Sequence, residues 1–362
     1  MRMGFGRALR LTLFGTSHGP AVGAVVEGLP AGTPIDLSKV QAELDRRRPV
    51  GRSLATKRQE EDQLQIEGGV EGGRTTGGPL IGTVQNQDVR RAPYAELEDV
   101  PRPGHADYPA RVRYGSAIDL SGGGIFSGRM TVGLVFAGAV ARGLLAPHGI
   151  EVLALTRSIG EVDASSSSLD RPLPELRQAV MAHEVGCPDR EAAPRMAAAI
   201  EVARREGDSL GGIVELRAEG VPAGVGEPFF DPVESVMAHA FLAIPAVKGV
   251  EFGAGFAAAR MRGSVHNDAF YSEGGQVRTR TNHAGGVLGG LTTGMPIIAR
   301  VVVKPTSSIA HEQESISLKT RESRRLVVKG RHDPCIVPRA VPVIENLGAF
   351  VLADLMLEGG FL

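Results

Sequence analysis

The sequence contains the hexapeptide Glu27-Gly28-Leu29-Pro30-Ala31-Gly32, and a near copy returns as Glu219-Gly220-Val221-Pro222-Ala223-Gly224. Each copy follows a short apolar run typical of a strand and precedes an aspartate at the start of a helical pattern. Glycine and proline in this order favour a sharp turn. The repeat predicts two related halves, around residues 8–48 and 212–245, packed within one domain that spans 1–362.

The rest of the chain alternates between strand and helix patterns. Strand patterns occupy residues 8–14, 22–26, 63–66, 81–84, 212–217, 250–261, 276–281 and 297–303. Helical patterns run from Asp36 or Ser38 to Arg46, over 128–147, over 190–207, from Asp231 through Phe241, and over 343–357. The helix over 128–147 is apolar nearly all round, which predicts burial on most sides, whereas the last helix is amphipathic. Hairpin-like strands covered by long helices predict an α+β fold with antiparallel sheets and a pseudo-twofold repeat.

Long irregular segments interrupt these elements. Residues 86–121 have little apolar periodicity, and a loop of that length inside a compact domain is usually functional or disordered. Polar residues dominate it, which favours a functional, active-site loop. Gly122-Gly123-Gly124 then precedes the apolar helix. It could cradle a phosphate or flavin at the helix N-terminus, or serve as a packing turn, and both interpretations stay open.

Composition limits the class of protein. The 362 residues are 42% hydrophobic and 22% charged, as in ordinary soluble proteins, and the net charge is −1. With no basic field, 4% aromatic residues and no Trp, we expect binding neither to nucleic acid nor to an anionic membrane. No apolar run reaches the roughly 18 residues of a membrane span, and the first residues lack a signal-peptide core. Cys187 and Cys335 have no CxxC spacing, so we expect reduced thiols in a cytoplasmic protein.

Three short segments combine histidine, aspartate and arginine with glycine or proline. They are Gly15-Thr16-Ser17-His18-Gly19, Arg102-Pro103-Gly104-His105-Ala106-Asp107-Tyr108 and Lys329-Gly330-Arg331-His332-Asp333-Pro334-Cys335. His18 and His105 sit beside glycine rather than on an apolar helix face, and histidine can transfer a proton at physiological pH. Asp333 precedes proline, so its stiff backbone predicts a fixed carboxylate or, alternatively, an Asx-turn.

The basic residues indicate an anionic ligand, because guanidinium groups bind phosphate and carboxylate in bidentate fashion. Arginines gather at the end of the first helix and in the polar loops: Arg46, Arg47, Arg48, Arg52, Arg58, Arg102, Arg111, Arg113, Arg129, Arg331 and Arg339. Lys304-Pro305-Thr306-Ser307-Ser308 adds an ammonium group and three hydroxyls, suited to a cofactor phosphate or ring oxygen. There is no HxxxH, HExxH or CxxC pattern, so we expect no metal site. A dinucleotide fingerprint and a Walker A loop are also absent from the sequence.

The three segments, together with Asn282-His283-Ala284-Gly285-Gly286 and residues 304–308, resemble the signature segments of chorismate synthase, nearly from end to end of the chain. The resemblance implies helices sandwiched between sheets and a homotetramer. It also implies the 1,4-anti elimination of phosphate from 5-enolpyruvylshikimate 3-phosphate to give chorismate, the last step of the shikimate pathway. Reduced FMN is required by this family although no net oxidation occurs. Whether the chain reduces FMN with NADPH or relies on an external flavin reductase stays open.

By this resemblance, His18 protonates the departing phosphate, His105 acts as an acid near the flavin, and Asp333 acts at the flavin N5. The residues that match FMN contacts of the family are Ile125, Phe126, Ser127, Pro245, Ala246, Gly289, Lys304, Pro305, Thr306, Ser307, Ser308 and Arg331.

The resemblance also assigns anion contacts. Arg47 matches the position assigned to NADPH or a nearby anion, and Arg52 is its expected partner. Arg129 matches a substrate-binding arginine, and Arg339 is a further candidate for the NADP or substrate anion.

Two departures from the family pattern affect the expected flavin contacts. The chain has Ile125-Phe126-Ser127-Gly128-Arg129 where the family most often has Arg-Ser-Ser-Ala-Arg, so one arginine contact is lost. Pro245 replaces the usual Asn, which removes a side-chain amide and a backbone donor. Two other functions compete with the lyase: a metal-dependent phosphohydrolase that uses the His and Asp residues, and a non-enzymatic anion-binding or RNA-binding module.

Overall fold

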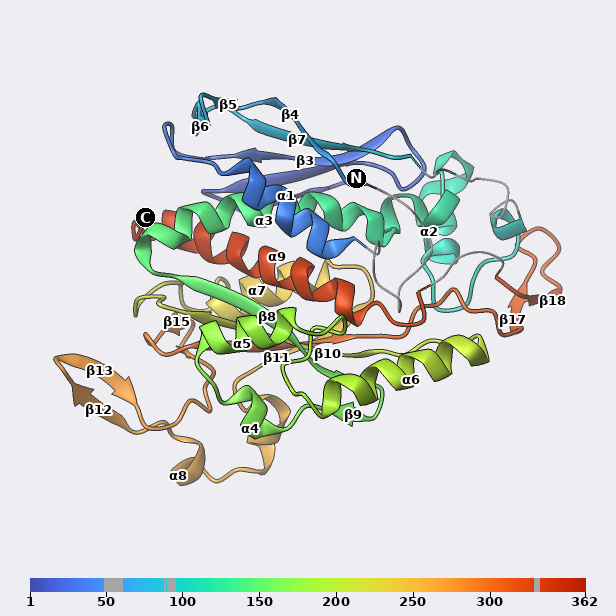
Figure 1. Cartoon of the computed structure of the whole chain (residues 1–362). Helices are drawn as coiled ribbons and strands as arrows, with labels where there is room; N and C mark the ends of the chain where they lie inside the picture. The colour runs from blue at the N-terminus through green and yellow to red at the C-terminus, as the bar shows by residue number, and fades with distance from the viewer. Residues whose placement is uncertain (49–60, 88, 90–95, 329–332) are drawn as a thin grey trace.

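The computed structural model describes residues 1–48, 61–87, 89, 96–328 and 333–362. Two five-stranded antiparallel sheets enclose a layer of helices (Figure 1). The first sheet has the order β1 (Gly4–Phe5), β2 (Arg10–Gly15), β3 (Ala21–Glu27), β7 (Leu80–Gln85) and β4 (Leu64–Gly68). The second has the order β11 (Val247–Phe252), β16 (Ile297–Val303), β10 (Gly212–Glu219), β8 (Glu151–Ile159) and β9 (Val162–Asp163). The predicted α+β class with antiparallel sheets is confirmed.

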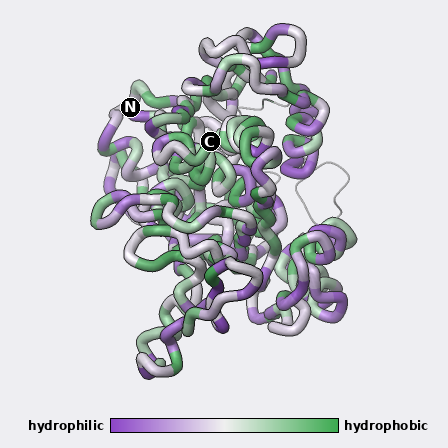
Figure 2. The backbone as a smooth tube through the Cα atoms, turned by 90° about the vertical axis from the view of Figure 1, so that its left-hand side faces the viewer, coloured by the Kyte–Doolittle hydropathy of each residue, from purple (hydrophilic) through white to green (hydrophobic). Residues whose placement is uncertain are grey.

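The helical layer consists of α1 (Leu37–Arg47), α3 (Thr131–Leu145), α7 (Val233–Leu242) and α9 (Val337–Glu358). On the far side of the second sheet lie α4 (Ser166–Leu169), α5 (Leu173–Met181) and α6 (Ala192–Glu206) (Figure 1). Hydrophobic segments concentrate in the interior and hydrophilic segments at the periphery (Figure 2). Burial of these apolar faces between two sheets is the main source of stability for such a layered fold.

The predicted burial of the helix over 128–147 on most sides is confirmed by α3, whereas the last helix is more buried than the sequence predicted. The prediction of an amphipathic helix over 343–357 was wrong, because α9 begins at Val337 and is buried on all sides through most of its length. The segment 128–148 and α9 are both long and apolar enough to cross a membrane, although no uninterrupted apolar run marked them. Their most apolar windows are 67% and 94% buried in the protein, as expected of core helices.

The two repeated turns use the same threonine contacts. Thr75 Oγ1 donates to the carbonyl of Pro30 at 2.5 Å, and Thr292 Oγ1 donates to the carbonyl of Pro222 at 2.6 Å. In each half the threonine hydroxyl also accepts a backbone N–H of the turn at 2.9 Å. These threonines end two short hairpins, β5–β6 (Val70–Glu71, Arg74–Thr75) and β14–β15 (Val287–Leu288, Leu291–Thr292). The matched contacts support related halves within one domain, which we retain as a proposal.

The glycines of the hexapeptides are required by close backbone packing. Gly28 and Gly220 have φ of +88° and +80°. A Cβ atom would lie 1.9 Å from the carbonyl oxygen of Ala8 in the first turn, and 2.2 Å from that of Gly149 in the second. Only glycine fits both the conformation and the space.

Several sequence predictions need correction. Asp36 caps α1, but Asp231 does not cap α7, since Pro232 occupies the cap position and the Asp231 carboxylate accepts a bond from Arg7 instead. The predicted strand 250–261 stops at Phe252 and gives way to a short 3-10 segment. The predicted loop 86–121 contains the helix α2 (Asp107–Tyr114), and the strand β8, which pairs with the central strand β10, was missing from the prediction. Further hairpins are β12–β13 (Phe270–Glu273, Gln276–Thr279) and β17–β18 (Gln313–Ile316, Ser323–Leu326).

Candidate active site

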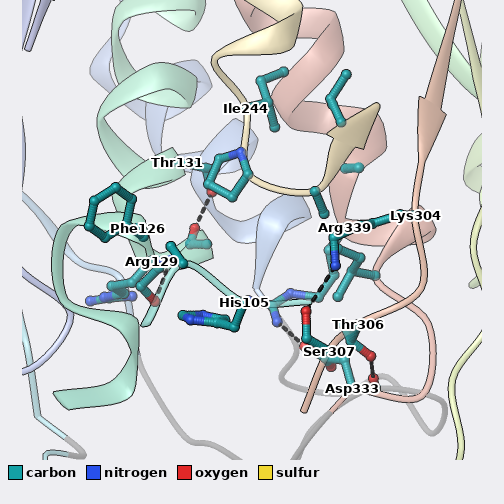
Figure 3. Close-up of a pocket in the computed structure, with 18 of the residues that line it drawn as sticks. His105, Phe126, Arg129, Thr131, Ile244, Lys304, Thr306, Ser307, Asp333 and Arg339 are labelled. Atoms are coloured by element: carbon teal, nitrogen blue, oxygen red, sulfur yellow. Dashed lines mark hydrogen bonds and ion pairs between the residues drawn. The ribbon is translucent and has the colours of Figure 1, made fainter. Parts of the chain in front are cut away.

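A cavity of about 600 Å³ opens at one end of the helical layer. It lies where α1 and α7 end and where α3 and α9 begin (Figure 3). A cavity of this size is typical of a small-molecule site. The unpaired N–H groups in the first turns of helices favour negative charge, so two helix starts at one cavity suit an anionic ligand.

The triple glycine packs against the two predicted histidines. Residues 122–124 have φ of +59°, +91° and +53°. A Cβ atom on Gly122 would lie 2.1 Å from Cε1 of His18, and one on Gly123 would lie 3.4 Å from Cε1 and Nε2 of His105. This close approach supports a packing role for the segment, with imidazole rings rather than a helix as its partners. The flavin cradle stays a prediction.

His18 is buried behind the cavity wall. Its side chain belongs to a residue that is 5% exposed, and Nδ1 lies 3.2 Å from Oγ of Ser17. His18 does not itself line the cavity, but Gly122, against which it packs, does. The glycine backbone is thus the partition between this imidazole and the cavity.

His105 lines the cavity and is oriented by a buried carboxylate. Its Nδ1 lies 2.7 Å from Oδ1 of Asp107. Arg102 donates from Nη2 to the same oxygen and from Nε to Oδ2, both at 2.7 Å. Burial alone would raise the pKa of Asp107, but hydrogen bonds from Arg102 and His105 outweigh it and hold this pKa well below its ordinary value. The ionised carboxylate fixes one ring nitrogen of His105 and places the other against Gly123.

The segment after β16 joins the histidine loop to Asp333. Lys304 Nζ donates to Oγ of Ser307 at 2.8 Å, and that hydroxyl donates to the carbonyl of Gly104 at 2.7 Å. Thr306 Oγ1 donates to the carbonyl of Asp333 at 2.8 Å. Burial lowers the pKa of Lys304. An ammonium group and hydroxyls therefore stand together at the cavity wall.

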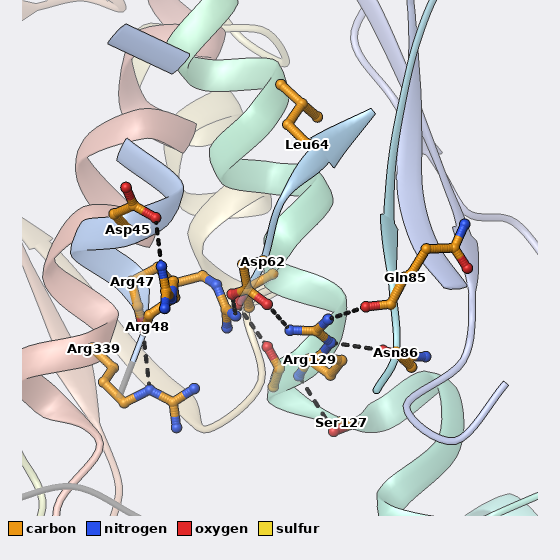
Figure 4. A network of polar contacts seen from close by, with 12 residues as sticks. Asp45, Arg47, Arg48, Asp62, Leu64, Gln85, Asn86, Ser127, Arg129 and Arg339 are labelled. Carbon is orange, nitrogen blue, oxygen red and sulfur yellow. Dashed lines mark hydrogen bonds and ion pairs between the residues drawn. The ribbon is translucent and has the colours of Figure 1, made fainter. Parts of the chain in front are cut away.

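Arginines pair with aspartates at two places around the cavity, Arg339 with Asp333 beside Thr306 (Figure 3), and Arg47 and Arg129 with Asp62 (Figure 4). Arg339 Nη1 bonds Oδ2 of Asp333 at 2.6 Å. Asp62 accepts one bond from Arg47 and another from Arg129, one on each carboxylate oxygen. Burial, with the nearby charges of Arg339 and Arg129, lowers the pKa of Arg47 to about 10 despite its pairing with Asp62. The wall is cationic, but each positive group has a fixed direction.

The remaining wall is apolar and comes mainly from the residues after α7. Its members are Phe126, Leu242, Ile244, Pro245, Ala246, Val247 and Ile336. Ala246 has φ of +72°, an uncommon value for a residue with a side chain, and its carbonyl accepts the N–H of Lys304 at 2.9 Å. An apolar wall facing hydroxyls and cations suits a planar ring system that carries phosphate.

Most of the predicted site residues line this one cavity. They are Arg47, His105, Ile125, Phe126, Ser127, Arg129, Pro245, Ala246, Lys304, Thr306, Ser307, Ser308, Asp333 and Arg339. Pro305 lies within the same segment without lining the cavity. Gly289 lies in the β14–β15 turn, next to Gly290, which accepts the N–H of Val233 at the opposite end of α7, so it does not reach this cavity within one chain. Outside the described residues lie Arg52, Arg331 and His332.

Two carboxylates that bind the predicted site residues had no role in the sequence interpretation. Asp62 follows the arginine-rich segment within an acidic run, and that run beside so many arginines was the available signal. Asp107 stands two residues after His105, a spacing that could have suggested an orienting carboxylate. Among the described residues, no group of three or more His, Cys, Asp or Glu side chains could hold a metal ion, so the geometry adds no support for the phosphohydrolase.

Comparison with known proteins decides the family. The family model for chorismate synthase matches residues 9–357. A chorismate synthase from Korarchaeum cryptofilum is 53% identical over 350 residues, covering 97% of this chain and 96% of its own. The chain belongs to the chorismate synthase family. Another chorismate synthase, from Pyrococcus abyssi, is 48% identical over 352 residues and 97% of each chain.

A solved structure agrees with this membership. A crystal structure of chorismate synthase matches with a TM-score of 0.79 at 30% identity, over 98% of this chain and 93% of the other. Chorismate synthases are enzymes of the lyase class, and this chain is one of them. The fold expected from the resemblance, with helices between sheets, agrees with the observed layers.

Proposed function

We propose that the chain eliminates phosphate from 5-enolpyruvylshikimate 3-phosphate to form chorismate, with reduced FMN as cofactor. The observation that carries this proposal is the composition of one cavity, in which an oriented histidine, a paired aspartate, an ammonium group and arginines surround an apolar wall. The substrate is polyanionic and loses phosphate from an allylic carbon. A site for it needs fixed cations, a proton donor and a place for a planar cofactor.

The residues present fit a flavin phosphate and ring system. Lys304, Thr306, Ser307 and Ser308 would hold the polar parts of FMN, and the wall around Phe126 and residues 244–247 would hold its ring. When bound, reduced FMN supplies the electron-rich partner that the elimination requires. Ile125 and Phe126, which depart from the common family pattern, add to the apolar wall rather than to charge pairing.

The chain's own residues would bind the phosphate ester and move protons. Arg47 and Arg129 place positive charge at the wall where a phosphate or carboxylate would lie. His105, fixed through Nδ1 by Asp107, would hold a proton at Nε2 toward the ligand. His18 would protonate the departing phosphate. The backbone of Gly122 stands between His18 and the cavity, so this loop would have to shift first.

Asp333 would act at the flavin N5 and assist the removal of the substrate proton there. Its carboxylate is held by Arg339 at 2.6 Å, and its carbonyl is held by Thr306 at 2.8 Å. The Asx-turn alternative would leave its carboxylate bonded to its own turn rather than to a cavity arginine. The pairing with Arg339 therefore favours a functional position at the cavity.

The assembly and the source of electrons are further parts of the proposal. We infer a homotetramer in the cytoplasm, where the buried thiols of Cys187 and Cys335 stay reduced; both cysteines are free in the structure. Burial raises the pKa of Cys187 to about 11 and that of Cys335 to about 12, so both are unreactive as thiolates. Reduced FMN would come from NADPH bound near Arg47 or from an external flavin reductase.

Anaerobic turnover with photoreduced FMN tests this function. With reduced FMN we expect equal amounts of chorismate and phosphate, and no chorismate with oxidised FMN alone. Adding NADPH to oxidised FMN separates self-reduction from an external reductase, since only the former restores turnover. Phosphate release that needs a divalent metal, produces no chorismate and ignores flavin would instead establish the phosphohydrolase.

A further inference from the structure

Asp62 lies between two arginines that come from different helices. Its side chain is fully buried, and its two oxygens accept bonds from Nη2 of Arg47, at the end of α1, and Nη1 of Arg129, just before α3. Its backbone has φ of +49°, an uncommon conformation that Asp and Asn tolerate better than most residues. One carboxylate therefore neutralises one of two buried positive charges and joins two separate elements (Figure 4).

The two arginines differ in how firmly the rest of the protein holds them. Arg129 Nε donates to Oδ1 of Asn86 at 2.8 Å, and Nη2 donates to the carbonyl of Gln85 at 3.3 Å. Arg129 is thus anchored to the end of β7 as well as to Asp62. Arg47, by contrast, has a buried Nε with no partner within the described ranges.

An unmet buried donor at a cavity wall, seen among the described residues, suits an acceptor on a bound ligand. The lost hydrogen bond of such a group costs about 1–3 kcal/mol, so ligand sites retain it only where a ligand completes it. Arg47 lines the cavity, and its side chain is 3% exposed. Arg129 and Arg339 both disfavour the charge on Arg47, and Asp62 is the group that compensates them.

We propose that Asp62 is a positioning residue that fastens Arg47 to the anchored Arg129 and so directs Arg47 toward an oxyanion of the substrate. The inference rests on the proposed function for the identity of that substrate, but not for the anion site itself. Asp62 fills the space between the guanidinium groups, which keeps a free anion from settling there. The cavity-facing edge of Arg47 is thereby reserved for the ligand.

Asp62→Asn tests the proposal, because Asn keeps the shape and the tolerance for positive φ but removes the charge. With two uncompensated arginines at its wall, the cavity should then bind inorganic phosphate about tenfold more tightly than in the wild type, as expected for one buried charge. Turnover should fall at least tenfold in kcat without a matching rise in KM, because the substrate is held but misplaced. Asp45→Asn is the matched control: Asp45 binds Arg48 at 2.9 Å on the same helix, its side chain is 48% exposed, and we expect no change.

The readouts are steady-state kinetics of the FMN-loaded enzyme and the rise in Tm of the flavin-free protein with inorganic phosphate. The double variant Arg47→Gln/Asp62→Asn removes both charges of the pair and should be no slower than Arg47→Gln alone. If Asp62→Asn fails to fold without phosphate, the Tm titration starts from phosphate-containing buffer, and the double variant supplies the kinetic comparison.

A merely structural role predicts lower Tm with unchanged phosphate affinity and unchanged kcat. That result, or additive effects in the double variant, would overturn the proposal. The phosphate titration can be interpreted even if the wild type makes no chorismate. Failure of this inference can therefore be distinguished from failure of the proposed function.

Discussion

The two halves of the chain agree at one end of the helical layer and differ at the other. At the turn end, where the hexapeptides lead into α1 and α7, Thr75 and Thr292 make the same contacts at 2.5 and 2.6 Å. At the cavity end the halves have different chemistry. The first half ends α1 with Arg47, whereas the second ends α7 with an apolar segment, 242–247.

The difference separates what builds the fold from what builds the site. Identical turn contacts at one end give each half the same strand-turn-helix geometry. At the other end the first half supplies Arg47 and Arg129 to the cavity, and the second supplies most of the apolar wall together with Lys304, Asp333 and Arg339. Under the proposed pseudo-symmetry, the two halves thus contribute different chemistry to one cavity, which suits an asymmetric ligand.

The largest effect is expected from removing a proton donor at the cavity end. His18→Ala should reduce turnover by about 10²–10⁴-fold, the usual contribution of a positioned acid, while the fold and FMN binding persist. Anaerobic stopped-flow assays of chorismate formation measure it. His148→Ala, an exposed histidine beyond the end of α3, is the control and should be neutral. Turnover within twofold of wild type in His18→Ala would remove His18 from the mechanism.

The buried ion pairs that join α9 to α1 and α3 should be the next most sensitive feature. Glu345 of α9 is fully buried and binds Arg46 of α1 at 3.0 Å and Arg142 of α3 at 2.5 Å. Breaking such a buried pair costs about 3–5 kcal/mol, so Glu345→Gln should lower the free energy of unfolding by that amount. Glu358→Gln, which removes an exposed partner of Arg7 on the same helix, should cost under about 1 kcal/mol.

The Glu345 carboxylate also makes the free energy of unfolding depend on pH. Burial would raise the pKa of Glu345, but Arg46 and Arg142 lower it to about 2, from 4.5. Because the folded-state pKa is depressed, the stabilisation is complete above pH 4.5 and is lost as the pH falls toward 2. Urea unfolding across this range should show the acid loss in the wild type and a smaller one in Glu345→Gln. Equal acid sensitivity in both proteins would place the effect at other carboxylates.

A smaller, symmetric loss is expected at the turn end. Gly28→Ala and Gly220→Ala each force a Cβ atom against a carbonyl oxygen, at 1.9 and 2.2 Å, and should destabilise by about 1–3 kcal/mol from overpacking, with further strain from positive φ. Gly32→Ala, with φ of +79° and no atom within 4 Å of its Cβ position, isolates the strain. Thermal unfolding measures all three. Very different losses at Gly28 and Gly220 would end the equivalence of the halves.

The sequence could predict features that depend on neighbouring residues. The hexapeptide turns, the cap Asp36 and most cavity residues followed from local patterns or motifs. Features set by distant partners could not be predicted: Asp62 takes its role from arginines 15 and 67 positions away. Asp231 binds Arg7 instead of capping its helix, because that arginine arrives from the far end of the chain.

Burial by tertiary packing explains the other differences. The helix α9 reads as amphipathic over 343–357 because Glu345 and Asn346 look like a polar face, yet both are fully buried, with Glu345 bound to arginines and Asn346 to Glu43 at 2.9 Å. The strand over 250–261 was predicted too long because Gly253 and Gly255, both at positive φ, turn the chain away.

Flavin titration of paired variants tests most directly whether the cavity end is the cofactor site. In the wild type, binding to the protein should change the absorbance of FMN and saturate at one FMN per chain. Lys304→Ala should weaken FMN binding by roughly 10- to 100-fold, since a charge-assisted contact contributes about 1.5–3 kcal/mol. Thr75→Val, at the turn end of the first half, should leave FMN affinity unchanged even as it lowers stability. Undiminished affinity in Lys304→Ala, or a loss in Thr75→Val as large as that in Lys304→Ala, would contradict the account.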